Sequence, residues 1–181
     1  MKKALMIIDV QKDYFTAGKM ELYQPEKALQ RINKLEESFL ALEWPIIYIQ
    51  HINVKKDASF FIPNTKGAKL HEKLKLRSHS IIIEKNFPNS FKNTQLLDIL
   101  QYFKVEQVVI TGMMTHMCVD STTRAAAELG FKPILLTDAT ATRSLNYLGE
   151  EVTAKQVQIS YLAALQNFAI LQTVDTFLGK E

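Results

Sequence analysis

The sequence is poor in cysteine, glycine and proline, and it contains no long hydrophobic run. Its single cysteine, Cys118, cannot form an internal disulfide, which favours a reducing, cytoplasmic location. The apolar stretch Ala4–Ile8 ends at Asp9 and is too short for a signal peptide. No stretch approaches the roughly 20 apolar residues that a membrane span needs. The first apolar stretch is followed by DVQKDYF instead of G-x-G-x-x-G, which argues against a dinucleotide-binding domain.

A strong charge imbalance is also missing. The chain has 22 basic and 19 acidic residues, a formal net charge of +3. No run of Lys or Arg exceeds two residues, which argues against the basic patch of a nucleic-acid-binding protein. What the chain does contain is 47% hydrophobic residues over 181 positions, which predicts one domain, residues 1–181, with a substantial core. We expect its partner to be a small-molecule substrate, with neither nucleic acid nor membrane involved.

Short apolar segments recur along the chain and alternate with helical patterns. This alternation predicts an α/β fold, a doubly wound, six-stranded parallel sheet with helices on both faces, Rossmann-like in arrangement. The predicted strands are Ala4–Ile8, Ile46–Ile49, Ile81–Ile83, Val108–Thr111, Pro133–Leu136 and Ala169–Leu171. The predicted helices are Pro25–Glu43, one capped by Asn93 or Thr94 that reaches Phe103, one from Cys118 to a cap at Gly130, and Gly149–Asn167.

Two connections are predicted to be irregular. The segment from Ile52 to Ser80 is unusually long for a compact domain, and such loops usually serve function. Its aromatic residues could cover a pocket or meet a partner subunit, and Leu70–Leu74 is compatible with a short helical turn. The second connection is a polar loop, Thr140–Asn146, after a fifth strand that ends at Asp138.

Cys118 lies where the strand Val108–Thr111 gives way to a helical pattern. In an open α/β sheet, ligands bind at the carboxyl ends of the strands. A helix N-terminus stabilises a thiolate, so we expect a Cys118 pKa below the value of about 8.5 for a free thiol. The alternative is that Cys118 is a small buried hydrophobic residue, a frequent fate of free cysteine.

Asp9 and Lys85 occupy the same kind of position at the ends of two other predicted strands. Each has a simpler interpretation: Asp9 as the cap of the following turn, and Lys85 as a solvated surface lysine. If the three strand ends converge, however, a thiol, a carboxylate and an ammonium form a nucleophile system. Lys85 would favour the thiolate, and Asp9 would move the proton.

Three segments, in this order and spacing, resemble the isochorismatase-like cysteine hydrolase superfamily, which includes nicotinamidases, N-carbamoylsarcosine amidohydrolase and streptothricin hydrolase. They are ALMIIDVQKDYF, IIIEKNFPNSF, and VVITGMMTHMCVDSTTRAAAELGF with LLTDATAT after it. The resemblance implies that Asp9, Lys85 and Cys118 form the catalytic triad. It also implies a cis peptide at Met113–Met114 and an oxyanion hole made by the Met114 and Cys118 amides.

The activity implied by the resemblance is hydrolysis of an amide, lactam or carbamoyl C–N bond through a thioester on Cys118. Homo-oligomers, dimers or tetramers, are implied in the same way. The substrate pocket is expected among residues of the variable loops and strand ends: Gln11, Phe15, Phe60, Phe87, Phe91 and His116. No cofactor is expected.

The chain departs from the nicotinamidase pattern at the metal site. Nicotinamidases that resemble it bind metal through Asp-x-His after the second strand, where this chain reads Gln50-His51-Ile52-Asn53. We therefore expect no metal, which also argues against nicotinamide as substrate. Three alternatives stay open, one of them a redox-sensing thiol, which would have no second cysteine for an intramolecular disulfide. Isochorismatases cleave a vinyl ether and commonly lack the cysteine, and a non-enzymatic binding protein could share the fold.

Overall fold

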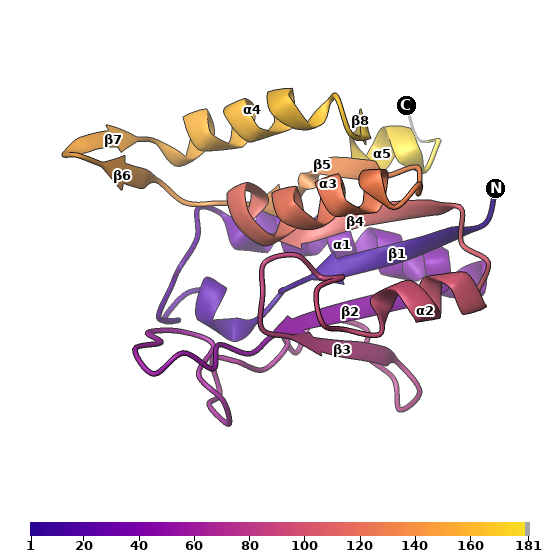
Figure 1. Cartoon of the computed structure of the whole chain (residues 1–181), viewed down its shortest axis with the longest axis horizontal. Coiled ribbons are helices and arrows are strands. Elements are labelled where there is room, and N and C mark those ends of the chain that lie inside the picture. The colour runs from indigo at the N-terminus through magenta and orange to yellow at the C-terminus, as the bar shows by residue number, and fades with distance from the viewer. Residues whose placement is uncertain (180–181) are drawn as a thin grey trace.

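The computed structural model describes residues 1–179, and it confirms the predicted α/β fold. Six parallel strands form one sheet in the order β3-β2-β1-β4-β5-β8 (Figure 1). The strands are β1 (Lys3–Ile8), β2 (Ile46–His51), β3 (Ile81–Lys85), β4 (Gln107–Met113), β5 (Ile134–Ala141) and β8 (Ile170–Gln172). The chain builds outward from β1 through β2 to β3, and then returns to β4 on the other side of β1. The crevice at which ligands bind in such sheets therefore lies between β1 and β4.

Helices cover both faces of the sheet, which is why its central strands β1 and β4 are mostly apolar and almost entirely buried. Leu5 and Ile7 of β1 pack in a core layer with α1 (Pro25–Ala41) and α5 (Val174–Phe177). Their neighbours Ala4, Met6 and Ile8 point to the opposite layer. That layer contains residues of α2 (Leu96–Tyr102), α3 (Asp120–Glu128) and α4 (Ala154–Leu165). Successive side chains of a strand point to opposite faces, so burial on both sides demands a continuous apolar run.

The predicted helix boundaries are accurate at some ends and wrong at others. α1 begins at Pro25, and Gly130 follows α3 with a positive φ of 88°, the conformation of a helix C-terminal glycine. The N-cap of α2 is Gln95, while the Thr94 hydroxyl accepts a hydrogen bond from the Leu96 amide. The helical pattern at Cys118 is also not simple α-helix, because Thr115–Val119 forms a π-helical turn before α3.

The predicted loop Thr140–Asn146 is correct only for residues 142–144, and the predicted helix start at Gly149 is wrong. β5 continues past Asp138 to Ala141. A β-hairpin of β6 (Leu145–Tyr147) and β7 (Glu150–Val152) then projects beyond the body of the molecule (Figure 1). α4 begins only after this hairpin, where Thr153 and Gln156 form a capping box.

The segment between β2 and β3 is irregular, as predicted, although Leu70–Leu74 forms turns and no helix. Asp13, in the 3₁₀ turn η1 (Lys12–Tyr14), anchors this segment because its carboxylate accepts from the Phe61 amide at 2.7 Å. Gly67 lies so close to the same carboxylate that a Cβ would be 2.0 Å from it. The loop is therefore tied to the chain just after β1, beside the sheet edge where the site lies.

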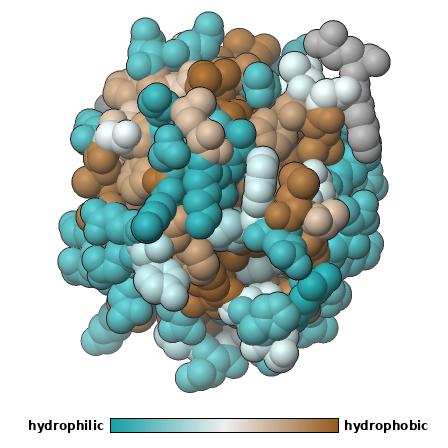
Figure 2. All heavy atoms as spheres, turned by 90° about the vertical axis from the view of Figure 1, so that its right-hand side faces the viewer, coloured by the Kyte–Doolittle hydropathy of each residue, from teal (hydrophilic) through white to brown (hydrophobic). Residues whose placement is uncertain are grey.

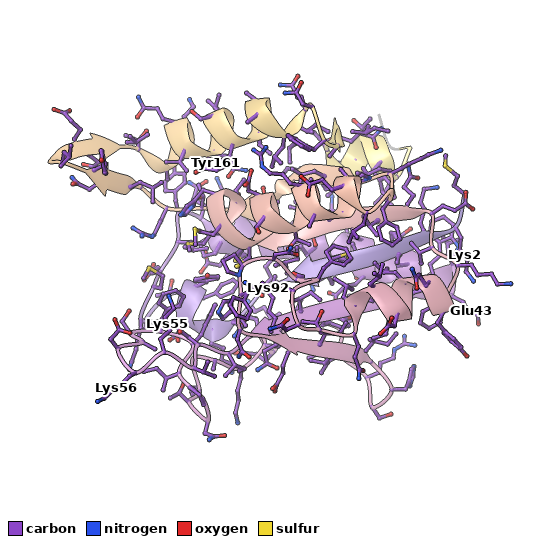
Figure 3. The ribbon with its side chains drawn as sticks, in the orientation of Figure 1. Lys2, Glu43, Lys55, Lys56, Lys92 and Tyr161 are labelled. Atoms are coloured by element: carbon purple, nitrogen blue, oxygen red, sulfur yellow. The ribbon has the colours of Figure 1, made fainter. Side chains whose placement is uncertain are left out.

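The face at which the strands begin shows hydrophilic and hydrophobic side chains intermingled over its surface (Figure 2). Lys2 and Glu43 lie on this side, whereas Lys55 and Lys56, on the loop after β2, lie at the end where the strands terminate (Figure 3). None of the helices within residues 1–179 has the length and hydropathy needed to cross a membrane.

Candidate active site

The side chains of Asp9, Lys85 and Cys118 meet at the carboxyl edge of the sheet, after β1, at the end of β3 and beyond β4. Lys85 Nζ donates to Asp9 Oδ2 at 2.8 Å. A carboxylate oxygen of Asp9 and Sγ of Cys118 lie within 4.8 Å of each other. Asp9 is fully buried, and Lys85 and Cys118 are only 2% and 4% exposed. The sequence separates these residues widely, and the parallel sheet brings them together.

The backbone at the crevice is held by unusual conformations. Asp9 has a left-handed φ of 51°, which turns the chain sharply after β1. Gly112 has a φ of 117°, and a Cβ at this position would lie 2.0 Å from the carbonyl oxygen of Ile8. Only glycine allows the end of β4 to approach β1 so closely. The peptide bond between the two residues after it, Met113–Met114, is cis, as the family resemblance implied.

Lys85 uses all three of its ammonium donors within the protein. Besides Asp9, it bonds to Nδ1 of His51 at 3.1 Å and donates to the Phe87 carbonyl at 3.1 Å. Burial lowers the pKa of Lys85, but Asp9 and then Cys118 raise it, and the net pKa is raised. Lys85 is therefore a fixed cation with no N–H left over to bond a substrate.

Asp9 differs, because only one of its oxygens is used. Oδ2 accepts from Lys85, while Oδ1 is buried with no hydrogen-bond partner among the described residues. The only other buried side-chain nitrogen or oxygen in residues 1–179 without a partner is Arg143 Nε. Buried polar groups are normally satisfied because an unmade hydrogen bond costs about 1–3 kcal/mol. A buried carboxylate that has one unsatisfied oxygen and lies within 4.8 Å of Cys118 Sγ is placed to accept the proton of that thiol.

The expected low pKa of Cys118 is wrong for this arrangement. Burial raises the pKa of the thiol, the negative charge of Asp9 raises it further, and the opposing effect of Lys85 does not reverse the outcome. Burial of the thiol is the largest cause, and Asp9, which pairs with Lys85 at 2.8 Å, also offsets the charge of that lysine. Cys118 is thus a neutral thiol at rest, and it needs a base when it attacks.

His51 also belongs to this cluster. The sequence analysis considered it only as part of the segment that lacks the Asp-x-His metal motif. Its Nδ1 lies 3.9 Å from Cys118 Sγ and 3.9 Å from Asp9 Oδ2. Burial, followed by smaller effects of opposite sign from Asp9 and Lys85, lowers the pKa of His51 to about 4. The imidazole is neutral at pH 7, and because Nδ1 accepts from the Lys85 ammonium, Nε2 carries the proton. Its position as the last residue of β2, in register with Lys85, was the signal available in the sequence.

The donor set of Asp9, His51 and Cys118 could in principle bind a metal ion, since their ligand atoms lie within 4.8 Å of one another. The Lys85 ammonium, however, is bonded to both the Asp9 carboxylate and the His51 imidazole. These lone pairs are therefore directed at an ammonium, and a divalent cation would have to displace it. The arrangement fits a buried lysine better than a metal, and the absence of a metal stays a prediction.

Two predicted pocket residues, Gln11 and Phe87, lie in the segments around the site, and their polar groups are bonded to atoms other than Cys118 Sγ. The Gln11 amide is fully engaged, donating to the His51 and Ala68 carbonyls and accepting from the His51 amide. It positions His51 and has a structural role. The Phe87 ring lies under Lys92 Nζ, 4.1 Å from its centroid, while the Phe87 carbonyl holds Lys85.

The other predicted pocket residues are more dispersed. Phe15 stacks on His71, and both line a surface cavity of about 430 Å³ that none of the three triad residues lines. Phe91 packs against Phe131, next to the core layer of α2 and α3. His116 is buried and bonds through Nδ1 to the Thr142 hydroxyl. The structure therefore does not gather these aromatic residues into one wall.

Tyr14 is a site residue that the sequence did not indicate. Burial raises the pKa of its phenol most, and Cys118 and Asp9 raise it further. The Tyr14 ring contacts Phe61 at 4.5 Å and Phe60 at 5.9 Å between ring centroids. These rings belong to the long loop after β2. Because Cys118 is 4% exposed, a substrate carbonyl reaches the sulfur only when side chains around it move.

Comparisons with known proteins agree with this geometry. The model of the isochorismatase domain matches residues 3–176. The chain is 41% identical to the isochorismatase family protein YddQ of Bacillus subtilis (strain 168) over 179 residues, covering 98% of this chain and 99% of that protein. The crystal structure of an isochorismatase hydrolase from Oleispira antarctica superposes with a TM-score of 0.94 at 34% identity, covering 98% of this chain and 96% of the other. Streptothricin hydrolase of Streptomyces noursei is 27% identical over 140 residues, 77% of this chain and 50% of that enzyme.

Proposed function

The chain belongs to the isochorismatase family of hydrolases, and we propose that it is a cysteine hydrolase that cleaves a C–N bond of a small amide, lactam or carbamoyl compound. The observation that carries this proposal is the state of Asp9. One of its oxygens is held by Lys85, and the other is buried without a partner near the only thiol of the chain. This is the arrangement that a general base for a thiol requires.

The first half of the reaction forms a thioester. As Sγ of Cys118 attacks the carbonyl carbon, its proton passes to Oδ1 of Asp9. The negative charge on the carbonyl oxygen is assigned to the backbone amides of Met114 and Cys118. When the C–N bond breaks, Asp9 returns this proton to the nitrogen, which leaves as an amine or ammonia. Lys85 stays protonated throughout and fixes the carboxylate.

The second half regenerates the enzyme. A water molecule gives its proton to Asp9 as its oxygen attacks the thioester carbon. The C–S bond then breaks, the acid product departs, and Asp9 returns the proton to Sγ. One carboxylate therefore serves twice as base and twice as acid, which is possible because its second oxygen has no structural bond to lose.

Similarity to streptothricin hydrolase supports hydrolysis in general, and the retained Cys118 supports the covalent route over vinyl-ether cleavage. The test is intact-protein mass spectrometry after incubation with a panel of amides, lactams and carbamoyl compounds. We expect an acyl adduct on Cys118, with no adduct and no turnover in Cys118→Ala. Turnover that survives Cys118→Ala but disappears in Asp9→Asn would instead favour the isochorismatase-type ether cleavage and would overturn the proposal.

A further inference from the structure

The π-helical turn that carries Cys118 is held from one side by α4. Its first residue, Thr115, is fully buried and donates through Oγ1 to Oε1 of Gln158 at 2.7 Å. One turn further along α4, the Tyr161 ring contacts the His116 ring edge-on, with 5.9 Å between the ring centroids. Tyr161 lies on the side of α4 that faces α3 (Figure 3). The inner face of α4 therefore contacts the first two residues of the turn, Thr115 and His116.

Gln158 also bonds to β5. Its Nε2 donates to the Thr140 hydroxyl at 2.8 Å and to the Thr137 carbonyl at 3.3 Å. The orientation of the amide follows from these neighbours, because Thr140 Oγ1 gives its own proton to the Thr137 carbonyl at 3.2 Å and accepts from Gln158. Oε1 is then the atom that faces Thr115. A single half-buried side chain thus links three segments, α4, β5 and the turn that carries Cys118.

Thr115 has one hydroxyl proton and two acceptors within reach. Gln158 Oε1 at 2.7 Å is the nearer acceptor, and the Ala141 carbonyl lies at 3.2 Å. If leucine replaces Gln158, the hydroxyl keeps Ala141 as an acceptor, so the buried donor of Thr115 is not left unsatisfied and little stability is lost. We therefore expect the turn to shift toward β5 while the fold persists.

A shift of Thr115 acts on the proposed oxyanion hole. The Met114 carbonyl, in the peptide that joins Met114 to Thr115, accepts from the amides of Met117 and Val119 at 3.0 and 3.3 Å. These two residues flank Cys118 in the chain. The Met114–Thr115 peptide and the Cys118 amide are therefore parts of one hydrogen-bonded unit, and a displacement of Thr115 changes the direction of both oxyanion donors.

The residues that move the proton are anchored separately. Asp9 follows β1 and Lys85 ends β3, and the two side chains bond to each other at 2.8 Å. The bonds of Gln158 go to Thr115 and to β5. Loss of Gln158 should therefore displace the oxyanion donors and leave the base of Cys118 in place.

We propose that Gln158 is a positioning residue of the active site, which holds Thr115 so that the Met114 and Cys118 amides point at the same carbonyl oxygen. This inference rests on the proposed function, because the oxyanion arises only if Cys118 attacks a carbonyl carbon. Gln158 acts through Thr115 and takes no part in proton transfer. Its loss should slow formation of the tetrahedral intermediate about tenfold, less than the roughly 100- to 1000-fold cost of removing an oxyanion donor outright.

Two reagents separate the oxyanion hole from the reactivity of the thiol. With p-nitrophenyl acetate, Sγ attacks the acetyl carbon, negative charge develops on the carbonyl oxygen, and p-nitrophenolate leaves while the thiol proton passes to Asp9. Iodoacetamide alkylates the same sulfur through its CH₂ group, iodide leaves, and no new charge develops on the carbonyl oxygen. Because the chain has one cysteine, peptide mass spectrometry assigns both adducts to Cys118, and the ratio of acylation to alkylation rates reports the oxyanion hole.

Gln158→Leu and Thr115→Val should each lower this ratio about tenfold. The double variant should lower it no further, because both substitutions remove the same hydrogen bond. Thr115→Ser, which keeps the hydroxyl, should stay close to wild type. The matched control is Gln166→Leu, at an exposed glutamine at the other end of α4 whose side chain bonds to the Ala163 carbonyl, and it should leave the ratio unchanged.

Circular dichroism would show that each variant is folded, and if Gln158→Leu does not fold, the comparison of Thr115→Val with Thr115→Ser decides. An unchanged ratio in Gln158→Leu, or an equal fall in both rates, overturns the positioning role even though Cys118 is acylated. Losses that multiply in the double variant also overturn it. Release of p-nitrophenolate by Cys118→Ala at the wild-type rate, with no acetyl adduct on Cys118 in wild type, would instead overturn the proposed function and this inference with it.

Discussion

Replacing Asp9 by asparagine should make Cys118 easier to ionise and yet stop turnover. The carboxylate has two effects on the thiol: its negative charge opposes the thiolate, and its unpartnered oxygen accepts the proton during attack. Asn removes the charge and the basicity while keeping the size of the side chain. It also suits the left-handed φ of 51° at this position, which asparagine tolerates well.

The size of the effect follows from the distance between the two groups. The Asp9 carboxylate and Cys118 Sγ lie within 4.8 Å of each other. Two unit charges at about 4.8 Å, in a medium with an effective dielectric constant of about 20, interact by about 3.5 kcal/mol. This corresponds to about 2.5 pKa units. The Lys85 ammonium, no longer neutralised, acts in the same direction, so Asp9→Asn should lower the apparent pKa of Cys118 by about two units or more.

The assay is the rate of iodoacetamide modification of Cys118 as a function of pH, followed by mass spectrometry. Breaking the buried ion pair destabilises the fold by about 3–5 kcal/mol, so circular dichroism must show that the variant is folded under the assay conditions. Lys85→Gln should move the thiol pKa in the opposite direction, and Asp120→Asn, at the ion pair on α3, should leave it unchanged. An unchanged or higher apparent pKa in Asp9→Asn, or turnover comparable to wild type, would refute the reasoning.

Two further predictions concern the neutral histidines. His51→Ala removes the acceptor of one Lys85 N–H, so it should lower the melting temperature and reduce kcat about tenfold. His51→Gln can still accept this hydrogen bond and should recover part of both losses. Equal behaviour of the two variants would contradict this role of His51. His51 and His116 have pKa values lowered to about 4 from 6.5, so the unfolded chain binds protons more readily below pH 6.5 and stability is lost as the pH falls from about 6.5 to about 4. Each histidine should cost about 2 kcal/mol at pH 5, measured by urea unfolding at pH 7 and pH 5, and a pH-independent free energy of unfolding would exclude the lowered values.

The parallel sheet was predictable because its strands contain short continuous apolar runs that alternate with helical patterns. The apolar runs also placed Asp9 and Lys85 at the ends of two strands, and the carboxyl ends of parallel strands lie at the same edge of the sheet. The protonation state of Cys118 was not predictable in this way. It depends on burial and on the 2.8 Å distance between Asp9 and Lys85, and neither is encoded in the local sequence.

His51 and Tyr14 show a second limit of the sequence. Each has an ordinary structural interpretation by residue type alone, as the end of a strand or an aromatic of the core. What makes them site residues is a contact between segments: His51 meets Lys85 across the β2–β3 pair, and Tyr14 is held by the loop that carries Phe61. The capping box at Thr153 and Gln156, by contrast, was present in the sequence and marks the true start of α4.

β5 ends at Ala141 and not at Asp138 as predicted, and this difference affects the site. Asp138 resembles a strand-end carboxylate, but its oxygens bond to the Val174 amide and to Arg31, on the face of α1 and α5. The pairing of β4 with β5 is irregular at this point: Leu135 pairs with Ile110, but the next pair is Thr140 with Gly112. β5 therefore has extra residues between the two pairs. Such an irregularity changes the direction of the residues that follow it.

The extra residues carry the chain to Ala141, beside the cis peptide, and bring Arg143 to the edge where Cys118 lies. A strand that ended at Asp138, with a loop after it, would give no reason to expect this arginine in the crevice. The position of Arg143 and the extended strand are therefore one feature, and a variant that shortens β5 should lose the pairing of Ala141 with Met113 and move Arg143 away from this edge.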